Sequence, residues 1–341
     1  MVMTDSLPWD IAKAHFPHDG GLADKLQFFV AYAILAPSSH NTQPWKFHLG
    51  DHGIDLYADR TRALPVVDPD DRALIMSCGA ALYNLCLAIR HFGYTDAVTL
   101  FPESDNSDLV ARIHVDRPGK ATTEEHELFW AIPRRRTNRH VYRTQPVPEV
   151  VVKKLQTIAR AEGAWLHLVE DKVQQYVVAD LIAEADRMQW MDKRFRRELA
   201  LWLHPERHRS RDGIPGYAFG TSEVIAYVGP FLLRTFDWGR GQAAKDRQLA
   251  TGSPLLAILG TDADTPSAWM AAGQALERML LQACAAGVAS SYLNQPIEVE
   301  ELRPRLRDLL GESGFPQLLL RMGYGPEVDP TPRRTLQEVM R

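Results

Sequence analysis

Pro37-Ser-Ser-His-Asn-Thr-Gln-Pro-Trp45 is the stretch of this chain that decides its fold. It lies between an apolar segment with helical spacing, residues 28–35, and a strand-like segment, residues 46–49. Because a proline restricts the backbone at each end, we predict a stiff loop. Its polar side chains provide more hydrogen-bonding groups than a simple connecting loop requires. We therefore expect a ligand-binding loop, with contacts from Pro37, Ser38, Ser39, Asn41 and Gln43.

A second stretch, Arg134-Arg-Arg-Thr-Asn-Arg139, carries four arginines in six residues. Guanidinium groups bind phosphate oxygens bidentately, and each charge-assisted hydrogen bond contributes roughly 1.5–3 kcal/mol net. A run of charge by itself more often forms a solvated face, but the polar loop upstream favours a phosphate site. The predicted contacts are Arg135, Arg136, Thr137 and Arg139.

These two stretches resemble motifs of the nitroreductase superfamily. Residues 36–45 closely match the family pattern A-P-S-x-x-N-x-Q-P-W, and residues 135–139 resemble R-R-S-x-R, with Thr137 in place of serine. The order of the motifs is reversed relative to single-domain members, which resembles the two-domain, Acg-like branch. The resemblance implies that FMN is the cofactor, that the loop contacts its isoalloxazine ring, and that the arginine segment contacts its phosphate.

Two further blocks carry the same resemblance. Thr331-Pro-Arg-Arg334 follows Gly323-Tyr-Gly-Pro326, and the family pattern implies that its arginines also reach the phosphate, although a frayed basic tail is the alternative. Residues 287–291 follow a helical segment, and the resemblance implies a turn of small residues near the reactive edge of the flavin. These blocks add Arg333, Arg334, Ser290 and Ser291 to the candidate cofactor contacts.

One helical segment occurs twice, at residues 76–93 and 270–287. Both copies have apolar residues at helical spacing, and each ends at a glycine suited to a left-handed C-terminal cap. Buried helices share Ala, Leu and Gly by chance, but glycines at matched distances favour a duplication. The matched pairs, all 194 positions apart, are Met76/Met270, Gly79/Gly273, Ala81/Ala275, Leu82/Leu276, Leu87/Leu281 and Gly93/Gly287.

Short strand-like segments are mixed irregularly with helices, which favours an α+β fold over a parallel α/β sheet. We predict two tandem nitroreductase-like lobes, each a mainly antiparallel sheet packed with helices: residues 1–120 with the ring-contacting loop, and residues 121–341 with the phosphate site. Glycines 50 and 53 predict a four-residue hairpin loop. The predicted strands are 46–49, 54–58, 98–101, 109–115, 165–169, 255–260 and 317–324.

Residues 185–245 do not fit the repeat. Aromatic side chains interleaved with arginines, and the glycine-rich run 212–217, predict a lid over the site. The alternative is that the aromatic side chains pack onto the core beneath them, and the sequence leaves both interpretations open. The aromatic residues concerned are Trp190, Trp202, Tyr217, Phe219 and Trp238.

Composition excludes several classes of protein. A chain of 341 residues has room for two ordinary domains, and a formal net charge of −4 argues against a nucleic-acid-binding domain. The sequence contains no apolar run of about 18 residues, so we predict no membrane span. Residues 1–10 show no export signal. Cysteines 78, 86 and 284 form no metal or disulfide pattern, so we expect neither a metal site nor a disulfide, and a reducing, cytoplasmic location.

Two motif-like runs are weaker signals. Gly239-Arg-Gly241-Gln-Ala-Ala244 imitates a dinucleotide fingerprint, but the segment before it is a poor core strand. His204-Pro-Glu-Arg-His208 lacks the order of HExxH, so a solvated turn is favoured and metal binding is the remote alternative.

The sequence predicts an FMN-dependent oxidoreductase that passes electrons from NADH or NADPH to a small electron-poor acceptor, a quinone or a nitro compound. Hydride transfer to a flavin requires no side-chain acid or base, so no catalytic residue is predicted. The alternative is a non-catalytic FMN-binding, storage or sequestering protein whose lid occludes the site. Because each motif occurs once, we expect one site per chain, at the junction of the lobes, in a monomer that acts as a pseudo-dimer.

Overall fold

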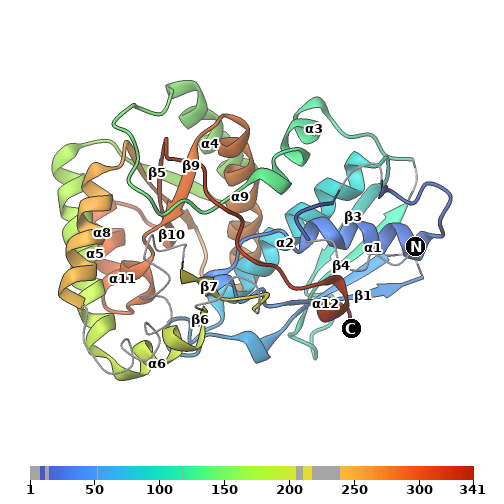
Figure 1. The fold of residues 1–341 in the computed structure, drawn as a ribbon, viewed down its shortest axis with the longest axis horizontal. Coiled ribbons are helices and arrows are strands. Elements are labelled where there is room, and N and C mark those ends of the chain that lie inside the picture. The colour runs from blue at the N-terminus through green and yellow to red at the C-terminus, as the bar shows by residue number, and fades with distance from the viewer. Residues whose placement is uncertain (1–7, 12–14, 52, 117, 205–209, 217–238) are drawn as a thin grey trace.

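The computed structural model contains two antiparallel sheets with helices between and around them (Figure 1). The residues that it describes are 8–11, 15–51, 53–116, 118–204, 210–216 and 239–341.

The first sheet has the strand order β1-β2-β4-β3, and every neighbouring pair is antiparallel. Its strands are β1 (Trp45–Gly50), β2 (Gly53–Ala58), β3 (Thr95–Leu100) and β4 (Leu109–Asp116). The surrounding helices are α1 (Leu22–Ala33), α2 (Arg72–His91), α3 (Thr123–Phe129), α12 (Leu336–Val339) and the short 3-10 turns η2 (Ser39–Asn41), η3 (Arg60–Arg62) and η4 (Ile132–Arg134).

The second sheet has the order β5-β8-β10-β9 and is also antiparallel. Its strands are β5 (Trp165–Val169), β8 (Leu255–Thr261), β9 (Ala289–Tyr292) and β10 (Phe315–Gly323). The helices around it are α4 (Glu149–Ala161), α5 (Lys172–Met191), α6 (Lys193–Leu201), α8 (Gly239–Gly252), α9 (Pro266–Ala285), α10 (Gln295–Glu298) and α11 (Leu302–Leu310). A separate short pair joins β6 (Leu203–His204) to β7 (Ile214–Pro215) in parallel.

The central strand β8 shows why this sheet is covered on both faces. Every residue of β8 is buried, and alternate side chains enter two different clusters. Ala257 and Leu259 pack with α4 and α9, whereas Leu256 and Ile258 pack with α5, α8, α10 and α11. A continuous apolar run, rather than an alternating one, is typical of such a doubly covered strand.

All seven predicted strands are confirmed, with bounds that differ by at most a few residues. The predicted four-residue hairpin loop is wrong, because β1 and β2 continue through Gly50 and Gly53, which pair with each other. A Cβ on Gly53 would lie 2.0 Å from the carbonyl oxygen of Ile113, so close backbone packing explains that glycine. Residues 287–291 were expected to form a turn, but residues 289–292 form strand β9, paired with β10.

Helices α2 and α9 pack against each other between the two sheets (Figure 1). Both have 20 residues, and their first and last residues are each 194 positions apart, as in the predicted repeat. The glycines after the helices, Gly93 and Gly287, have φ of 83° and 72°, which confirms their predicted left-handed conformation. Since β1, β2, β3 and β4 occupy the same places in their sheet as β5, β8, β9 and β10, the two halves share one strand order.

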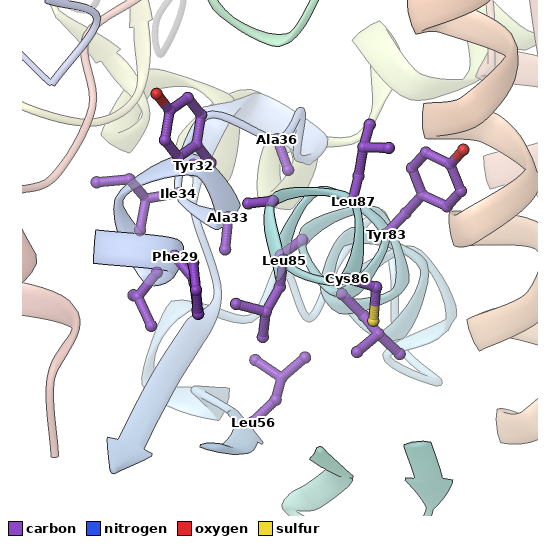
Figure 2. Packing of buried hydrophobic residues seen from close by; sticks show 14 of the residues in the cluster. Phe29, Tyr32, Ala33, Ile34, Ala36, Leu56, Tyr83, Leu85, Cys86 and Leu87 are labelled. Carbon is purple, nitrogen blue, oxygen red and sulfur yellow. The ribbon is translucent and has the colours of Figure 1, made fainter. Parts of the chain in front are cut away.

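The core beside α2 contains side chains from α1 and the first sheet. Figure 2 shows Phe29 of α1 and Leu85 of α2 next to each other, with Leu56 of β2 below them, and all three are fully buried. Burial of each such side chain contributes about 1.5–3 kcal/mol. Among the described residues, α2 alone is long and apolar enough to cross a membrane, but 94% of its apolar window lies inside the protein.

The end of the chain returns to the first sheet. Phe47 of β1 forms a parallel bridge with Met340, and its carbonyl oxygen accepts a hydrogen bond from the Arg341 N–H at 2.8 Å. Figure 1 shows this C-terminal segment passing from the second sheet to β1. The division of the chain at residue 120 stays a prediction. It assigns Met340 and Arg341 to the second half, but both contact Phe47 of the first half.

Candidate functional site

A cavity of about 270 Å³ brings together most of the predicted site residues. Its volume is close to the lower end of the roughly 300–1,000 Å³ that is typical of ligand sites. Asn41 and Arg139, nearly 100 positions apart, line the same cavity. The predicted residues in its wall are Pro37, Ser38, Ser39, Asn41, Arg135, Thr137, Arg139, Ser291 and Arg333, whereas Gln43, Arg136, Ser290 and Arg334 do not line it.

The polar loop is held in an unusual backbone conformation. His40, Asn41 and Gln43 have φ of 50°, 55° and 52°, which non-glycine residues rarely adopt. Ser38 Oγ accepts a hydrogen bond from the Gln43 N–H at 2.9 Å, and Asn41 Nδ2 donates to the carbonyl oxygen of Gly213 at 2.9 Å. Backbone strain of this kind persists where the surroundings fix it, and it is common at ligand sites.

Gln43 and Arg334 support this loop from behind. Gln43 Oε1 accepts a hydrogen bond from the Arg334 N–H at 2.8 Å, and the Gln43 carbonyl accepts another from Arg334 Nη1 at 2.9 Å. Both side chains are buried away from the cavity wall. These hydrogen bonds give Gln43 and Arg334 an internal role in fixing the loop. Their contact with a cofactor stays a prediction.

Two arginines from distant segments converge beneath the loop. Arg333 Nη1 donates to Asn41 Oδ1 at 2.8 Å, and Arg333 Nη2 and Arg135 Nη2 both donate to the carbonyl oxygen of Leu35, at 3.2 and 3.3 Å. Glu277 of α9 lies 3.6 Å from Arg135 and is fully buried. Burial raises the pKa of Glu277, and the Arg135 charge opposes that shift. The charges of Arg135 and Arg333 both favour the ionised form of Glu277.

Arg136 and Ser290 take other places. Arg136 lies over the Trp9 ring, 4.3 Å from its centre, and donates to the carbonyl oxygens of Pro133 and Arg135 at 2.8 Å. Ser290 forms a bridge with Thr137, which fixes the arginine segment beside β9. Successive side chains of an extended segment point in opposite directions, so Arg135 and Arg136 have different surroundings. The sequence had predicted that both contact the phosphate.

Arg321 of β10 is a site residue that the sequence interpretation missed. It lines the cavity, is 1% exposed, and is paired in register with Ser291. Its Nη2 donates to the Asn138 carbonyl at 3.2 Å, and the guanidinium lies 4.2 Å from the centre of the Tyr142 ring. Its Nε and Nη1 have no hydrogen-bond partner among the described residues. The sequence feature that could have identified it is an arginine within the otherwise apolar segment 318–322.

Burial makes the charge of Arg321 costly, and Arg139 lies close enough for the two charges to interact. Burial lowers the pKa of each guanidinium, and the charge of Arg321 lowers that of Arg139 further. Burial, followed by the Arg139 charge, lowers the pKa of His40 to about 4, so His40 is neutral at pH 7. A buried cation with unsatisfied donors costs free energy that a bound anion would recover.

The described part of the predicted lid contributes apolar wall to the cavity. Trp190, Phe195, Leu199 and Ile214 line it, and Trp190 and Phe195 also pack against residues 64 and 67 of the first half. These contacts agree with the core-packing alternative for Trp190. Tyr217, Phe219 and Trp238 lie outside the described residues, and the lid stays a prediction.

One of the two weaker sequence signals has an ordinary structural explanation, and the other lies mostly outside the described residues. Gly239 to Ala244 lie within helix α8, and no group of three or more His, Cys, Asp or Glu side chains in the described ranges could hold a metal. His204 Nε2 lies 3.3 Å from Asp212 Oδ1, while residues 205–209, with His208, lie outside the described part of the chain.

The sequence of the chain that carries this site matches a known protein family. The family model "Nitroreductase family" matches residues 132–324, more than half of the chain. The chain belongs to the nitroreductase family. The match includes the arginine segment, β9 and Arg321, but the polar loop lies before its first residue.

Individual nitroreductase relatives match over nearly the whole chain. "Putative NAD(P)H nitroreductase Rv3131" of Mycobacterium tuberculosis is 33% identical, covering 96% of this chain and 92% of the relative. "Putative NAD(P)H nitroreductase acg" of the same organism is 29% identical over 93% and 95% of the two chains. The crystal structure of the "FMN and NADPH-dependent nitroreductase NfnB" from sphigopyxis sp. strain HMH is 18% identical, covers 62% and 96% of the chains, and has a TM-score of 0.40.

Proposed function

We propose that this chain is an FMN-dependent oxidoreductase that passes electrons from NADH or NADPH to a small electron-poor acceptor, such as a quinone or a nitro compound. The observation that carries the cofactor proposal is Arg321, a buried cation in the cavity wall with two donors that lack partners in the described residues. A phosphate group would satisfy these donors, and each charge-assisted hydrogen bond contributes roughly 1.5–3 kcal/mol.

The residues in the wall suit both ends of FMN. Arg135, Thr137 and Arg139, together with Arg321 and Arg333, would hold the phosphate, and Ser38, Ser39 and Asn41 would hydrogen-bond the ring. The bound flavin would supply two-electron chemistry, accepting a hydride from one molecule and giving it to another. The protein's part is to hold the cofactor, to position the two reactants in turn and to limit access of water.

The electron donor is proposed from the relatives, whose names describe them as NAD(P)H nitroreductases. The two halves are proposed to act as a pseudo-dimer within one monomer, because their sheets share one strand order and the loop and arginine segment come from different halves. We also propose one cofactor site per chain, since each motif occurs once in the sequence.

Titration of the purified protein with FMN, followed by flavin fluorescence, tests the cofactor proposal. We expect saturation at one FMN per chain, and failure to bind FMN would overturn the proposal. Anaerobic addition of NADH or NADPH to the complex then tests catalysis through bleaching of the flavin absorbance. FMN binding without bleaching by either nucleotide would support the storage alternative instead.

A further inference from the structure

Two buried aspartates on neighbouring helices share one amide group at the cavity wall. Gln295 Nε2 of α10 donates to Asp186 Oδ1 of α5 at 3.2 Å and to Asp246 Oδ2 of α8 at 2.8 Å. Gln242 Nε2 donates to the same Asp246 oxygen at 2.8 Å. All four side chains belong to residues that line the cavity. The two carboxyl groups are therefore held close together by the amide between them.

One oxygen of this pair has no hydrogen-bond partner among the described residues. Asp186 is 2% exposed, and its Oδ2 makes no hydrogen bond within the described part of the chain; the same holds for the buried Gln295 Oε1. A buried oxygen without a donor is costly, and a carboxyl group lowers that cost by retaining a proton. An unsatisfied carboxyl oxygen beside an unsatisfied amide oxygen marks a place for a polar group of a ligand.

Burial of the pair also favours a retained proton. Burial is the largest cause and, with the neighbouring Asp246 charge, raises the pKa of Asp186 to about 8; burial also raises the pKa of Asp246. Two neighbouring buried carboxyl groups share a proton, because both cannot ionise cheaply in a buried site. The other charged groups that act on the pair are Glu298, which opposes ionisation, and Arg187, Lys245 and Arg321, which favour it.

Apolar side chains lie next to this pair. Trp190 is four residues after Asp186 on α5, and Leu249 is three residues after Asp246 on α8, so each lies on the same helix face as its aspartate. Both line the cavity, as does Phe195. A flat apolar molecule with one polar oxygen would find packing surface and a hydrogen-bond donor in this part of the cavity.

We propose that Asp186 and Asp246 form the acceptor-binding part of the cavity, where the Asp186 carboxyl hydrogen-bonds an acceptor oxygen and gives it a proton during reduction. A bound reduced flavin would supply the hydride that a quinone needs. The Asp186 O–H bond would break as a new O–H bond forms on the quinone, which would become a hydroquinone, and the Asp186 carboxylate would regain its proton from water. This inference rests on the proposed function.

The first test separates electron transfer from proton transfer. Asp186→Asn keeps the size of the side chain but removes the acidic proton, and Asp180→Asn is the matched control, because Asp180 is an exposed residue of α5 paired with Arg247. Flavin reduced anaerobically is mixed with p-benzoquinone or with ferricyanide, which takes electrons without a proton. General acid catalysis typically contributes 10²–10⁴-fold.

At pH 7 we expect Asp186→Asn to slow reoxidation by p-benzoquinone about 10²-fold, with reoxidation by ferricyanide, FMN affinity and reduction by NAD(P)H unchanged. Asp180→Asn should change none of these rates. Equal slowing with both acceptors, or no slowing with p-benzoquinone, would overturn the inference. If the wild-type protein binds no FMN, the proposed function fails first, which is a separate result.

The second test needs neither cofactor nor activity. A carboxyl group whose pKa is raised by folding contributes stability that is fully present below its unfolded pKa and is lost as the pH rises through its folded pKa. Denaturation midpoints of the wild-type apoprotein should therefore fall, relative to Asp186→Asn, as the pH rises from about 4 to about 8. Asp246→Asn should show a similar difference. Midpoints that run parallel for both variants would rule out the retained proton.

Discussion

Gly79 of α2 and Gly273 of α9 lie face to face where the two helices cross, and their contacts are reciprocal. A Cβ on Gly79 would lie 2.4 Å from the carbonyl oxygen of Met270, and one on Gly273 would lie 2.1 Å from that of Met76. These are the matched residues of the internal repeat. A contact in which each residue meets its own counterpart is what a two-fold relation between the helices produces.

Gly79→Ala is predicted to destabilise the protein by about 1–3 kcal/mol, because the added methyl group overlaps a backbone oxygen that cannot move independently of its helix. This loss exceeds the gain of up to about 1 kcal/mol from helix propensity. Denaturant unfolding of the purified variant measures the difference. Gly241→Ala in α8 is the control, since its Cβ would meet no described atom within 4 Å apart from its own neighbours in the helix. A Gly79→Ala variant as stable as Gly241→Ala would contradict the prediction.

Arg321→Met is predicted to change cofactor binding and apoprotein stability in opposite directions. It removes a buried charge whose Nε and Nη1 lack partners in the described residues, so the apoprotein should become equally or more stable. FMN affinity should fall about 10- to 100-fold, the equivalent of one charge-assisted hydrogen bond. Isothermal titration and thermal unfolding give the two values. Arg305→Met, at an exposed arginine paired with Glu184, should alter neither.

The arginine segment gives a prediction that separates neighbouring residues. Arg139→Ala should weaken FMN binding at least 10-fold, because Arg139 lines the cavity, is half-buried and interacts with the charge of Arg321. Arg136→Ala should leave the affinity within about 3-fold, since Arg136 lies over Trp9 outside the cavity wall. The two dissociation constants, measured by flavin fluorescence, decide this. Equal losses would show that both arginines reach the phosphate, as the sequence interpretation assumed.

His40 is predicted to make the apoprotein sensitive to mild acid. Burial and the Arg139 charge lower its pKa to about 4, so the folded protein binds the His40 proton less readily than the unfolded chain. The stability contributed by neutral His40 is therefore present above about pH 6.5 and is lost as the pH falls towards 4. Unfolding midpoints of wild type and His40→Asn should converge over this range, since asparagine tolerates the left-handed backbone at this position. A constant difference between the two would refute the shift.

Much of the fold follows from local patterns in the sequence. The seven strands show alternating or continuous apolar runs, the paired helices show helical spacing, and glycines 93 and 287 mark where the helices end. Local patterns failed at β9, where Ser290 and Ser291 carry little strand signal. Pairing with β10, a long-range contact, makes that segment a strand.

The sequence by itself determined the family motifs, the loop between two prolines and the candidate contacts Asn41, Arg135 and Arg139, because these features are contiguous in the chain. Only the tertiary structure decided which arginines face the cavity: Arg321 enters it from a strand, while Arg136 turns to Trp9. The pairing of Asp186 with Asp246 depends on how α5, α8 and α10 pack. Side-chain direction and burial are set by contacts between distant segments, and no short window of sequence contains them.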